Sequence, residues 1–456
     1  MPVRLKTMCA KKLDGFQSSN SSFWRQSSGA IPGRVNQTKS SGFGAAAHSF
    51  QDFQESVSDA WDIEEPITPT SAPVKESKEG TVSKEKDGIT PTHSLSQIQS
   101  RQVTPRLNLI RRSPPNPAQS PDLEKEKTKC AKFEKVLSGS PVSIAELEKL
   151  SWSGVPQPYR TRVWKMLCGY LPAGKSDLVL QRKREEYIGY VNQYFNNKEE
   201  DIHKDTFRQI SIDVPRMSPL VTLFQQKPVQ EMVERILYIW AIRHPASGYV
   251  QGINDLVTPF LMVFLQDYVD TDVTRVHFQF DELEEQVRKD IEADAFWCMT
   301  KVLEGIQDNY TFAQPGIQVK IRQLEELLKR VDQDLHNHIV GHDVQYLQFS
   351  FRWMNNLLLR ELPLTATIRL WDTYLAETEG FSKFHLYVCA AFLIRWKVDL
   401  MNKKDFQGIL LFIQNVPTAK WNDKDISLLV AEAYRLKYTF ADAPNHLPDC
   451  RIKTSM

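Results

Sequence analysis

The chain has 456 residues, which is enough for one large or two medium domains. Its 57 lysines and arginines nearly balance 56 aspartates and glutamates, and the formal net charge of +1 argues against a nucleic-acid-binding surface. The six cysteines are scattered with no close pair, which argues against a zinc knuckle or a disulfide framework. This composition indicates an intracellular enzyme or adaptor.

Residues 1–130 differ in character from the rest of the chain. They are rich in Ser, Thr, Pro and Lys, hold eleven of the 25 prolines, and contain only Trp24 and Trp61 of the ten tryptophans. Because such a segment cannot bury enough apolar surface to order itself, we predict a disordered tail. Its first 50 residues have the composition of a mitochondrial transit peptide but lack a sustained apolar helical face, which argues against import.

Two features of this tail suit partner binding. The stretch from Ser58 to Glu65 is acidic around two apolar anchors, and it fits a short docking peptide and a chance cluster equally well. Phosphorylation would add about −1.5 to −2 charge per site, which a phosphopeptide-binding adaptor could recognise. Five tail residues precede a proline and resemble sites for proline-directed kinases, so phosphorylation is expected there: Thr68, Thr90, Thr104, Ser113 and Ser120.

An all-α domain is predicted over residues 131–446, followed by a short C-terminal tail at residues 447–456. Its first clear apolar pattern has helical spacing from Arg160 to Leu171 and ends at Pro172.

A P-loop is the alternative for the segment that follows. Gly169 to Ser176 matches the pattern G-x-x-x-x-G-K-S letter for letter, and a true P-loop would make the chain a nucleotide hydrolase. That reading requires a buried strand before the match and a parallel sheet around it. Helical spacing before the match, and the lack of alternating strands and helices elsewhere, argue against it.

Two short segments flank the next predicted helix. Ile210 to Arg216 reads Ile-Ser-Ile-Asp-Val-Pro-Arg, and Tyr249 to Gly252 reads Tyr-Val-Gln-Gly. Between them, Lys227 to His244 has apolar residues at three- and four-residue steps, with a proline near its start and a proline and a glycine beyond its end. This pattern places Arg216 in a loop before the helix and Gln251 just after it.

The remaining sequence predicts a series of helices, because its apolar residues recur at three- and four-residue steps and rarely alternate with polar residues as in a β-strand. His336 and His338 lack the spacing and the companion acid of a helical zinc site, so no metal site is predicted. The later helices are expected over Leu324 to Leu335, Val344 to Arg360, Leu364 to Leu375, His385 to Leu400 and Lys424 to Tyr438.

The two flanking segments resemble the paired signatures of the TBC-domain family, whose members speed GTP hydrolysis on Rab-type small GTPases. In that family the first signature reads Ile-x-x-Asp-x-x-Arg and the second reads Tyr-x-Gln-Gly. The resemblance implies an all-α fold of two packed helical lobes. It makes Arg216 and Gln251 the catalytic residues and gives supporting roles to Asp213, Tyr249, Gly252 and Arg160.

The similarity extends over roughly residues 150–445, with a signature core at about 154–378. Gly-Val-Pro at residues 154–156 resembles the opening of the family's domain, and Arg369 to Asp372 resembles a later signature. Residues 240–252 are similar to the member-22 subgroup in particular. One departure is Met217, where the family often has threonine, and its effect is expected to be small.

The implied chemistry explains why an arginine and a glutamine should come together. An arginine from a partner can stabilise the charge that spreads over the phosphate oxygens, and such a finger is worth about 10³ to 10⁵ in rate. Its planar fork meets two oxygens at once, whereas lysine acts as a point charge. A glutamine amide orients the attacking water, and by resemblance Gln251 supplies that amide in place of the GTPase's own. Pro215 restricts the backbone beside Arg216.

These inferences predict an activator that acts on a Rab-type GTPase and does not hydrolyse GTP itself. It needs no cofactor of its own, because GTP and Mg²⁺ belong to the partner. A non-catalytic helical adaptor that holds a Rab and docks partners through its tail is the alternative. The longest apolar runs fall short of the roughly 18 residues of a membrane span, so any membrane association would be peripheral. The resemblance implies a cytoplasmic protein of vesicle trafficking and intracellular protein transport, at the peripheral Golgi membrane.

Overall fold

The computed structural model describes residues 121–174, 177–197, 203–269 and 278–441. The predicted tails therefore lie outside the described residues, apart from the segment that begins at Pro121. The chain divides into two units between Thr128 and Lys129, inside helix α2, and the larger unit includes all described residues from Lys129 onward. The predicted boundary at residue 130 falls within this helix.

Every regular element in the described ranges is helical, and the predicted all-α fold is confirmed. The helices of the first half are α2 (Pro121–Leu137), α3 (Ile144–Ser151), α4 (Gln157–Leu167), α5 (Asp177–Tyr194), α6 (Lys204–Asp213), α7 (Lys227–Arg243), α8 (Thr258–Leu265) and α9 (Glu285–Glu304). Short helical turns between them are η1 (Phe195–Asn197), η2 (Val214–Arg216), η3 (Thr222–Gln225), η4 (Ile253–Val257) and η5 (Phe280–Glu282).

The second half continues in the same manner. Its helices are α10 (Pro315–Val331), α11 (Gln333–Gly341), α12 (Leu347–Asn355), α13 (Leu364–Ala376), α14 (His385–Arg395), α15 (Lys397–Met401), α16 (Phe406–Gln414) and α17 (Asp423–Phe440). Two short turns complete it, η6 (Gln307–Asn309) and η7 (Gly380–Phe384).

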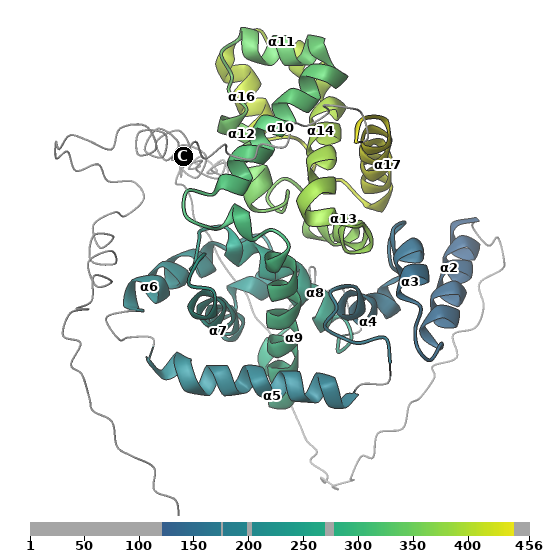
Figure 1. Ribbon diagram of the computed structural model, residues 1–456, viewed down its shortest axis with the longest axis vertical. Coiled ribbons are helices and arrows are strands. Elements are labelled where there is room, and N and C mark those ends of the chain that lie inside the picture. The colour runs from purple at the N-terminus through teal and green to yellow at the C-terminus, as the bar shows by residue number, and fades with distance from the viewer. Residues whose placement is uncertain (1–120, 175–176, 198–202, 270–277, 442–456) are drawn as a thin grey trace, which may run out of the picture. The chain divides into compact units, whose positions relative to one another are not determined.

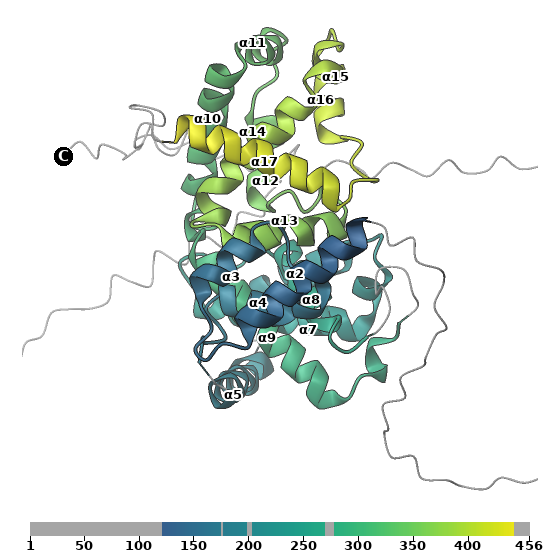
Figure 2. The ribbon, with the colours of Figure 1, turned by 90° about the vertical axis from the view of Figure 1, so that its right-hand side faces the viewer.

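Within the larger unit the helices form two groups, an N-terminal lobe of α3 to α9 and a C-terminal lobe of α10 to α17 (Figure 1). Figure 2 shows the same two groups from the side, with α13 at their junction. Helix α13 packs against α3, α4 and α8 of the first lobe and against α17 of the second. One hydrophobic core runs through both lobes, so the two groups form a single packed body.

Helix α7 lies at the centre of the N-terminal lobe and confirms the helix predicted over Lys227 to His244, within one residue at its end. It packs on α5, α6 and α9, and its apolar residues are almost fully buried. Because α7 is buried on several sides, the segments at its two ends are fixed relative to each other.

Four of the predicted helices prove to be shorter or divided. The helix predicted to reach Leu171 ends at Leu167, because the N–H groups of the next turn bond back to the Lys165 carbonyl. The segment predicted from Leu324 spans the end of α10 and the start of α11, since Asp332 caps the new helix by accepting from the Leu335 N–H at 3.1 Å.

The segment predicted from His385 to Leu400 is likewise split, into α14 and α15, at Trp396. The helix predicted over Val344 to Arg360 covers only Leu347–Asn355, because Leu357 and Leu358 have left-handed backbone angles, with φ of 55° and 65°. Helices α13 and α17 match the predicted spans to within two residues.

The P-loop alternative for Gly169 to Ser176 is contradicted by the fold. Helix α4 precedes the match where a P-loop requires a strand, and no strand occurs in the parts of the chain that the structure describes. Tyr170, inside the match, is buried and donates to Asp294 of α9 at 2.7 Å. Lys175 and Ser176 lie outside the described residues.

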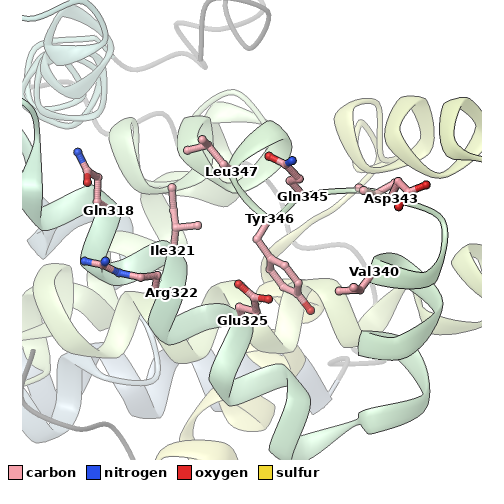
Figure 3. Close-up of a pocket in the computed structure, with 10 residues that line it drawn as sticks. Gln318, Ile321, Arg322, Glu325, Val340, Asp343, Gln345, Tyr346 and Leu347 are labelled. Atoms are coloured by element: carbon pink, nitrogen blue, oxygen red, sulfur yellow. The ribbon is translucent and has the colours of Figure 1, made fainter. Parts of the chain in front are cut away.

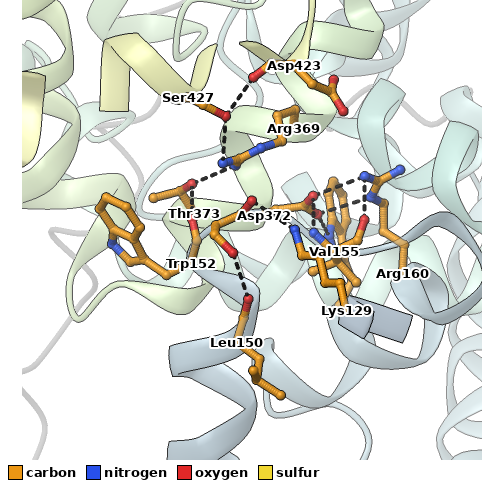
Figure 4. Close-up of polar contacts among 12 residues, drawn as sticks. Lys129, Leu150, Trp152, Val155, Arg160, Arg369, Asp372, Thr373, Asp423 and Ser427 are labelled. Carbon is orange, nitrogen blue, oxygen red and sulfur yellow. Dashed lines mark hydrogen bonds and ion pairs between the residues drawn. The ribbon is translucent and has the colours of Figure 1, made fainter. Parts of the chain in front are cut away.

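The buried carboxylate of Asp372 joins the lobes at α13 (Figure 4). Its Oδ1 accepts from the Trp164 indole N–H at 2.7 Å, and its Oδ2 accepts from the Val155 N–H at 2.8 Å. The Arg160 guanidinium reaches both oxygens at 3.1 Å and also donates to the Val155 carbonyl. The Gly-Val-Pro segment and α4 are therefore anchored on α13.

Gly154 is required where this segment passes α13. Its φ is 101°, and a Cβ there would lie 2.7 Å from Nε of the buried Arg369 side chain. Any other residue would displace Arg369, which donates to the Thr373 hydroxyl at 2.9 Å. This close approach explains the glycine of the segment.

No helix among the described residues is both long enough and apolar enough to cross a bilayer.

Replacing Asp372 by alanine should lower the free energy of unfolding by about 3–5 kcal/mol, because it removes the carboxylate from the partly buried Arg160 and leaves the buried Trp164 N–H without its acceptor. Chemical denaturation of both proteins measures the difference. Glu432→Ala, which removes an exposed partner of Arg435, is the control and should cost about 1 kcal/mol or less. Equal losses in the two variants would contradict the anchoring role.

Candidate functional site

Arg216 lies at the end of η2, the short turn that directly continues α6, and not in the irregular loop that the sequence predicted. Val214 and Met217, on either side of it, are fully buried, while Pro215 and Arg216 are exposed. The backbone is thus anchored at both ends and presents the arginine to solvent. Met217 is one of these core anchors, which accounts for an apolar residue beside the arginine.

Gln251 follows the end of α7 in a turn that leads into η4. Gly252 has a φ of 105°, a conformation that L side chains rarely adopt, so a glycine is required after Gln251. The residues of η4 are almost fully buried, whereas Gln251 itself is half-buried. The turn therefore fixes the backbone of Gln251 and leaves its side chain partly accessible.

A hydrogen bond connects the two segments. The Tyr249 hydroxyl lies 3.0 Å from Oδ2 of Asp213 and 3.3 Å from Oδ1 of Asn254. Gln209 donates to the same Asp213 oxygen at 3.1 Å, and the Gly252 N–H donates to Asn254 at 3.0 Å. Asp213 and Tyr249 thus link the turn that carries the arginine to the turn that carries the glutamine.

Burial dominates the electrostatics of this link. It raises the pKa of Asp213, against the hydrogen bonds from Gln209 and Tyr249 and the charge of Arg216, which all favour the carboxylate. Burial and the neighbouring Asp213 also raise the pKa of Tyr249 well above its usual value. Tyr249 therefore remains a hydroxyl donor at neutral pH.

The C-terminal lobe contributes two more contacts that sequence reasoning missed. Asn355, the last residue of α12, donates from Nδ2 to the backbone carbonyl of Gln251 at 2.9 Å. Arg360 donates from Nε to the buried Asp255 in η4 at 2.7 Å. The polar residues 254 and 255 lie inside an apolar run of the sequence, a pattern that could have indicated buried polar contacts there. No pattern in the sequence pointed to Asn355.

The predicted site residues thus fall into two sets. Asp213, Tyr249, Gly252 and Gln251 belong to one network, with Arg216 at its edge. Arg160 belongs to the Asp372 cluster at the α4–α13 junction (Figure 4). In the described part of the chain Arg216 forms no ion pair, and no group of three or more His, Cys, Asp or Glu side chains is arranged to hold a metal ion.

A pocket of about 510 Å³ lies elsewhere, between α10 and the segment that joins α11 to α12 (Figure 3). Its rim carries charges of both signs, from Arg322 and from Glu325 and Asp343. None of the predicted site residues lines it. The candidate site is therefore separate from this pocket and is built on the turns that carry Arg216 and Gln251.

Comparisons with known proteins show the family of the chain. Residues 157–401 match the model of the Rab-GTPase-TBC domain, RabGAP-TBC. The chain belongs to this family. It is 55% identical over 377 residues to TBC1 domain family member 22B of Homo sapiens, covering 82% of this chain and 74% of that protein. It is also 55% identical over 359 residues to member 22A of Mus musculus, covering 78% of this chain and 69% of that protein. The predicted resemblance to the member-22 subgroup is confirmed.

A fungal relative and a solved structure extend the comparison. The chain is 49% identical over 321 residues to the GTPase-activating protein gyp1 of Schizosaccharomyces pombe, covering 69% of this chain and 62% of that protein. The crystal structure of the Ypt/Rab-GAP domain of Gyp1p superposes with a TM-score of 0.64 at 45% identity, covering 69% of this chain and 99% of that domain. The fold of this TBC chain is thus similar to one determined by experiment.

Asp213→Asn should become more stable relative to the wild type as pH rises. Because the folded-state pKa of Asp213 is raised above 3.8, ionising this carboxyl costs more in the folded than in the unfolded chain. The amide mimics the neutral acid and avoids that cost. Unfolding measured on both proteins from about pH 4 upward should show the difference growing through the folded pKa. A difference that instead shrank as pH rose would contradict the burial argument.

Proposed function

We propose that this chain is a GTPase-activating protein for Rab-type small GTPases, and that Arg216 and Gln251 act as its catalytic fingers. Relatives that carry this activity in their names support the reaction. The observation that carries the residue assignment is the hydrogen bond from Tyr249 to Asp213, since it couples the turns that present the two side chains.

Arg216 is suited to stabilise charge in the transition state of GTP hydrolysis. It is exposed at the tip of a turn whose flanking residues are buried, and it forms no ion pair with any described acid that would compete for its guanidinium. Its planar fork can contact two phosphate oxygens at once. The backbone of η2 fixes the position from which the Arg216 side chain extends, and the side chain is free to enter the site of a partner.

Gln251 is suited to orient the attacking water. Its amide can accept from water and donate to the phosphate, which is the role that a glutamine plays in GTPases themselves. The backbone at this position is held by Asn355 and by the turn at Gly252. In this proposal GTP and Mg²⁺ come with the Rab, and the chain needs no cofactor of its own.

The alternative is a non-catalytic adaptor that binds a Rab through the helical domain. An adaptor would not require an arginine and a glutamine presented on two coupled turns. The presence of both side chains, each on an anchored backbone, favours the activator.

We further propose that the segment before α2 serves as a docking arm for a phosphopeptide-binding adaptor. We also propose that the protein is cytoplasmic, is located at the peripheral Golgi membrane and acts in vesicle trafficking. Support for the docking arm comes from the Ser/Thr-Pro pairs in the sequence, and support for the location comes from family resemblance.

Arg216→Ala and Arg216→Lys should each reduce the stimulation of GTP hydrolysis by at least about 10²-fold, because lysine keeps the charge but loses the fork. A screen of Rab proteins identifies a responsive substrate, and single-turnover hydrolysis on it measures the effect. Arg435→Ala, which removes an exposed arginine of α17, is the matched control and should behave as wild type. If both Arg216 variants kept full activity, the arginine assignment would be wrong.

Gln251→Ala should slow hydrolysis to a comparable extent, while the wild-type chain should still activate a Rab whose own switch glutamine has been replaced. Both results follow if the water is oriented from this chain. The same single-turnover assay on normal and substituted Rab compares them. Complete resistance of the substituted Rab would mean that Gln251 does not supply the amide.

A further inference from the structure

The last residue of α12 and the turn that follows it reach across the lobe junction and contact the segment that carries Gln251 at residues 251 and 255. Asn355 donates to the Gln251 carbonyl at 2.9 Å, and Arg360 pairs with Asp255 at 2.7 Å. These contacts join residues 104 and 105 positions apart in the sequence. The C-terminal lobe thus contacts residues 251 and 255 of the N-terminal lobe, one at each end of the glutamine segment, residues 251–255.

The contacting turn is held in a conformation that its sequence disfavours. Leu357 and Leu358 both have positive φ and are fully buried, a combination that is costly for a branched side chain and persists only when the surroundings enforce it. An ion pair from Arg352 to Glu361 at 2.6 Å closes the turn across its two ends. Such enforced strain is concentrated at functional sites in proteins.

The orientation of the Asn355 amide is fixed by its own partners. The residue is fully buried, and its backbone carbonyl accepts from the Tyr310 hydroxyl at 2.7 Å. Its Oδ1 lies 3.4 Å from Nε2 of Gln314, a donor, so the Nδ2 group is the one that faces Gln251. The donor that holds the glutamine backbone therefore has a single orientation.

We infer that Asn355 is a positioning residue for Gln251 and that the C-terminal lobe, through Asn355 and Arg360, sets the direction of the glutamine finger. This inference rests on the proposed function. Without the bond to Asn355, the carbonyl of Gln251 could rotate and move the side-chain amide away from the attacking water. Loss of this bond would slow the chemical step and not weaken binding of the Rab, since Asn355 is buried and cannot contact the GTPase.

Asn355→Ala should therefore lower kcat for GTP hydrolysis by about 10- to 100-fold, the range expected for a misplaced catalytic group, and leave KM for the Rab nearly unchanged. Asn415→Ala removes a comparable amide-to-carbonyl bond at an exposed position of the same lobe and is the matched control. Thermal unfolding of both variants separates a loss of fold from a loss of positioning. A rise in KM for the Rab with an unchanged kcat would overturn the inference.

A double-mutant cycle with Gln251→Ala provides the decisive comparison. If Asn355 acts through Gln251, adding Asn355→Ala to Gln251→Ala should reduce kcat by less than about twofold. Full multiplication of the two single losses would show that Asn355 supports the domain in some other way, and the inference would fail.

Asn355→Asp gives a second test if the alanine variant does not fold. An ionised carboxylate would repel the Gln251 carbonyl, whereas the protonated acid can donate to it as the amide does. The kcat of this variant, taken relative to wild type, should rise as pH falls from about 8 to about 6. A ratio that stays constant with pH would contradict the proposed bond.

These outcomes can be separated from failure of the proposed function. If the wild-type chain accelerates no Rab, both proposals fail. If the wild type is active and Gln251→Ala is impaired while Asn355→Ala is not, the activator stands and the positioning role is refuted. If Gln251→Ala is as active as wild type, Arg216 can still be catalytic, but the role of Asn355 is refuted together with the glutamine finger.

Discussion

The hydrogen bond between Tyr249 and Asp213 is the interaction on which the arrangement of the site depends. Arg216 precedes α7 and Gln251 follows it, so the two flanking segments must turn back toward each other for Asp213 and Tyr249 to meet. The bond joins the two segments that flank α7, and burial raises the pKa values of both partners, so that the donor keeps its proton. The buried Asp213 is thus costly to ionise, and it links the turns that carry the two proposed fingers.

The two lobes are held together by contacts of different kinds, and the difference bears on function. At the α4–α13 junction, Asp372 is surrounded by donors from the Gly-Val-Pro segment and α4, which makes a rigid and fully buried anchor. At the glutamine segment, Asn355 donates to the Gln251 carbonyl, and the partly exposed Arg360 pairs with Asp255. The first junction anchors α4 on α13, and in our proposal the second sets the direction of Gln251.

Much of this architecture follows from the sequence, for identifiable reasons. Helix α7 was predicted almost to the residue, because its apolar spacing is strong and its ends are marked by proline and glycine. Helix breaks at Asp332 and at Leu357 were missed, since neither a capping aspartate within an apolar pattern nor two leucines with positive φ give a local signal. The motifs identified Asp213, Tyr249 and Gln251. Asn355 could not be found in this way, because its role depends on a tertiary contact with a backbone atom.

The two proposed fingers are prepared to different degrees, and the contrast has a physical basis. Gln251 must hold a neutral water molecule, a weak and directional interaction, so its backbone is fixed in advance from both lobes. Arg216 meets a concentrated negative charge, and the strength of that attraction can offset the roughly 2 kcal/mol of rotamer freedom that an ordered arginine loses. A preformed ion pair would hold the guanidinium away from its target. Arg216 is exposed and forms no ion pair with any described acid. Its backbone is fixed by the anchored turn, and its side chain can extend into the site of a partner.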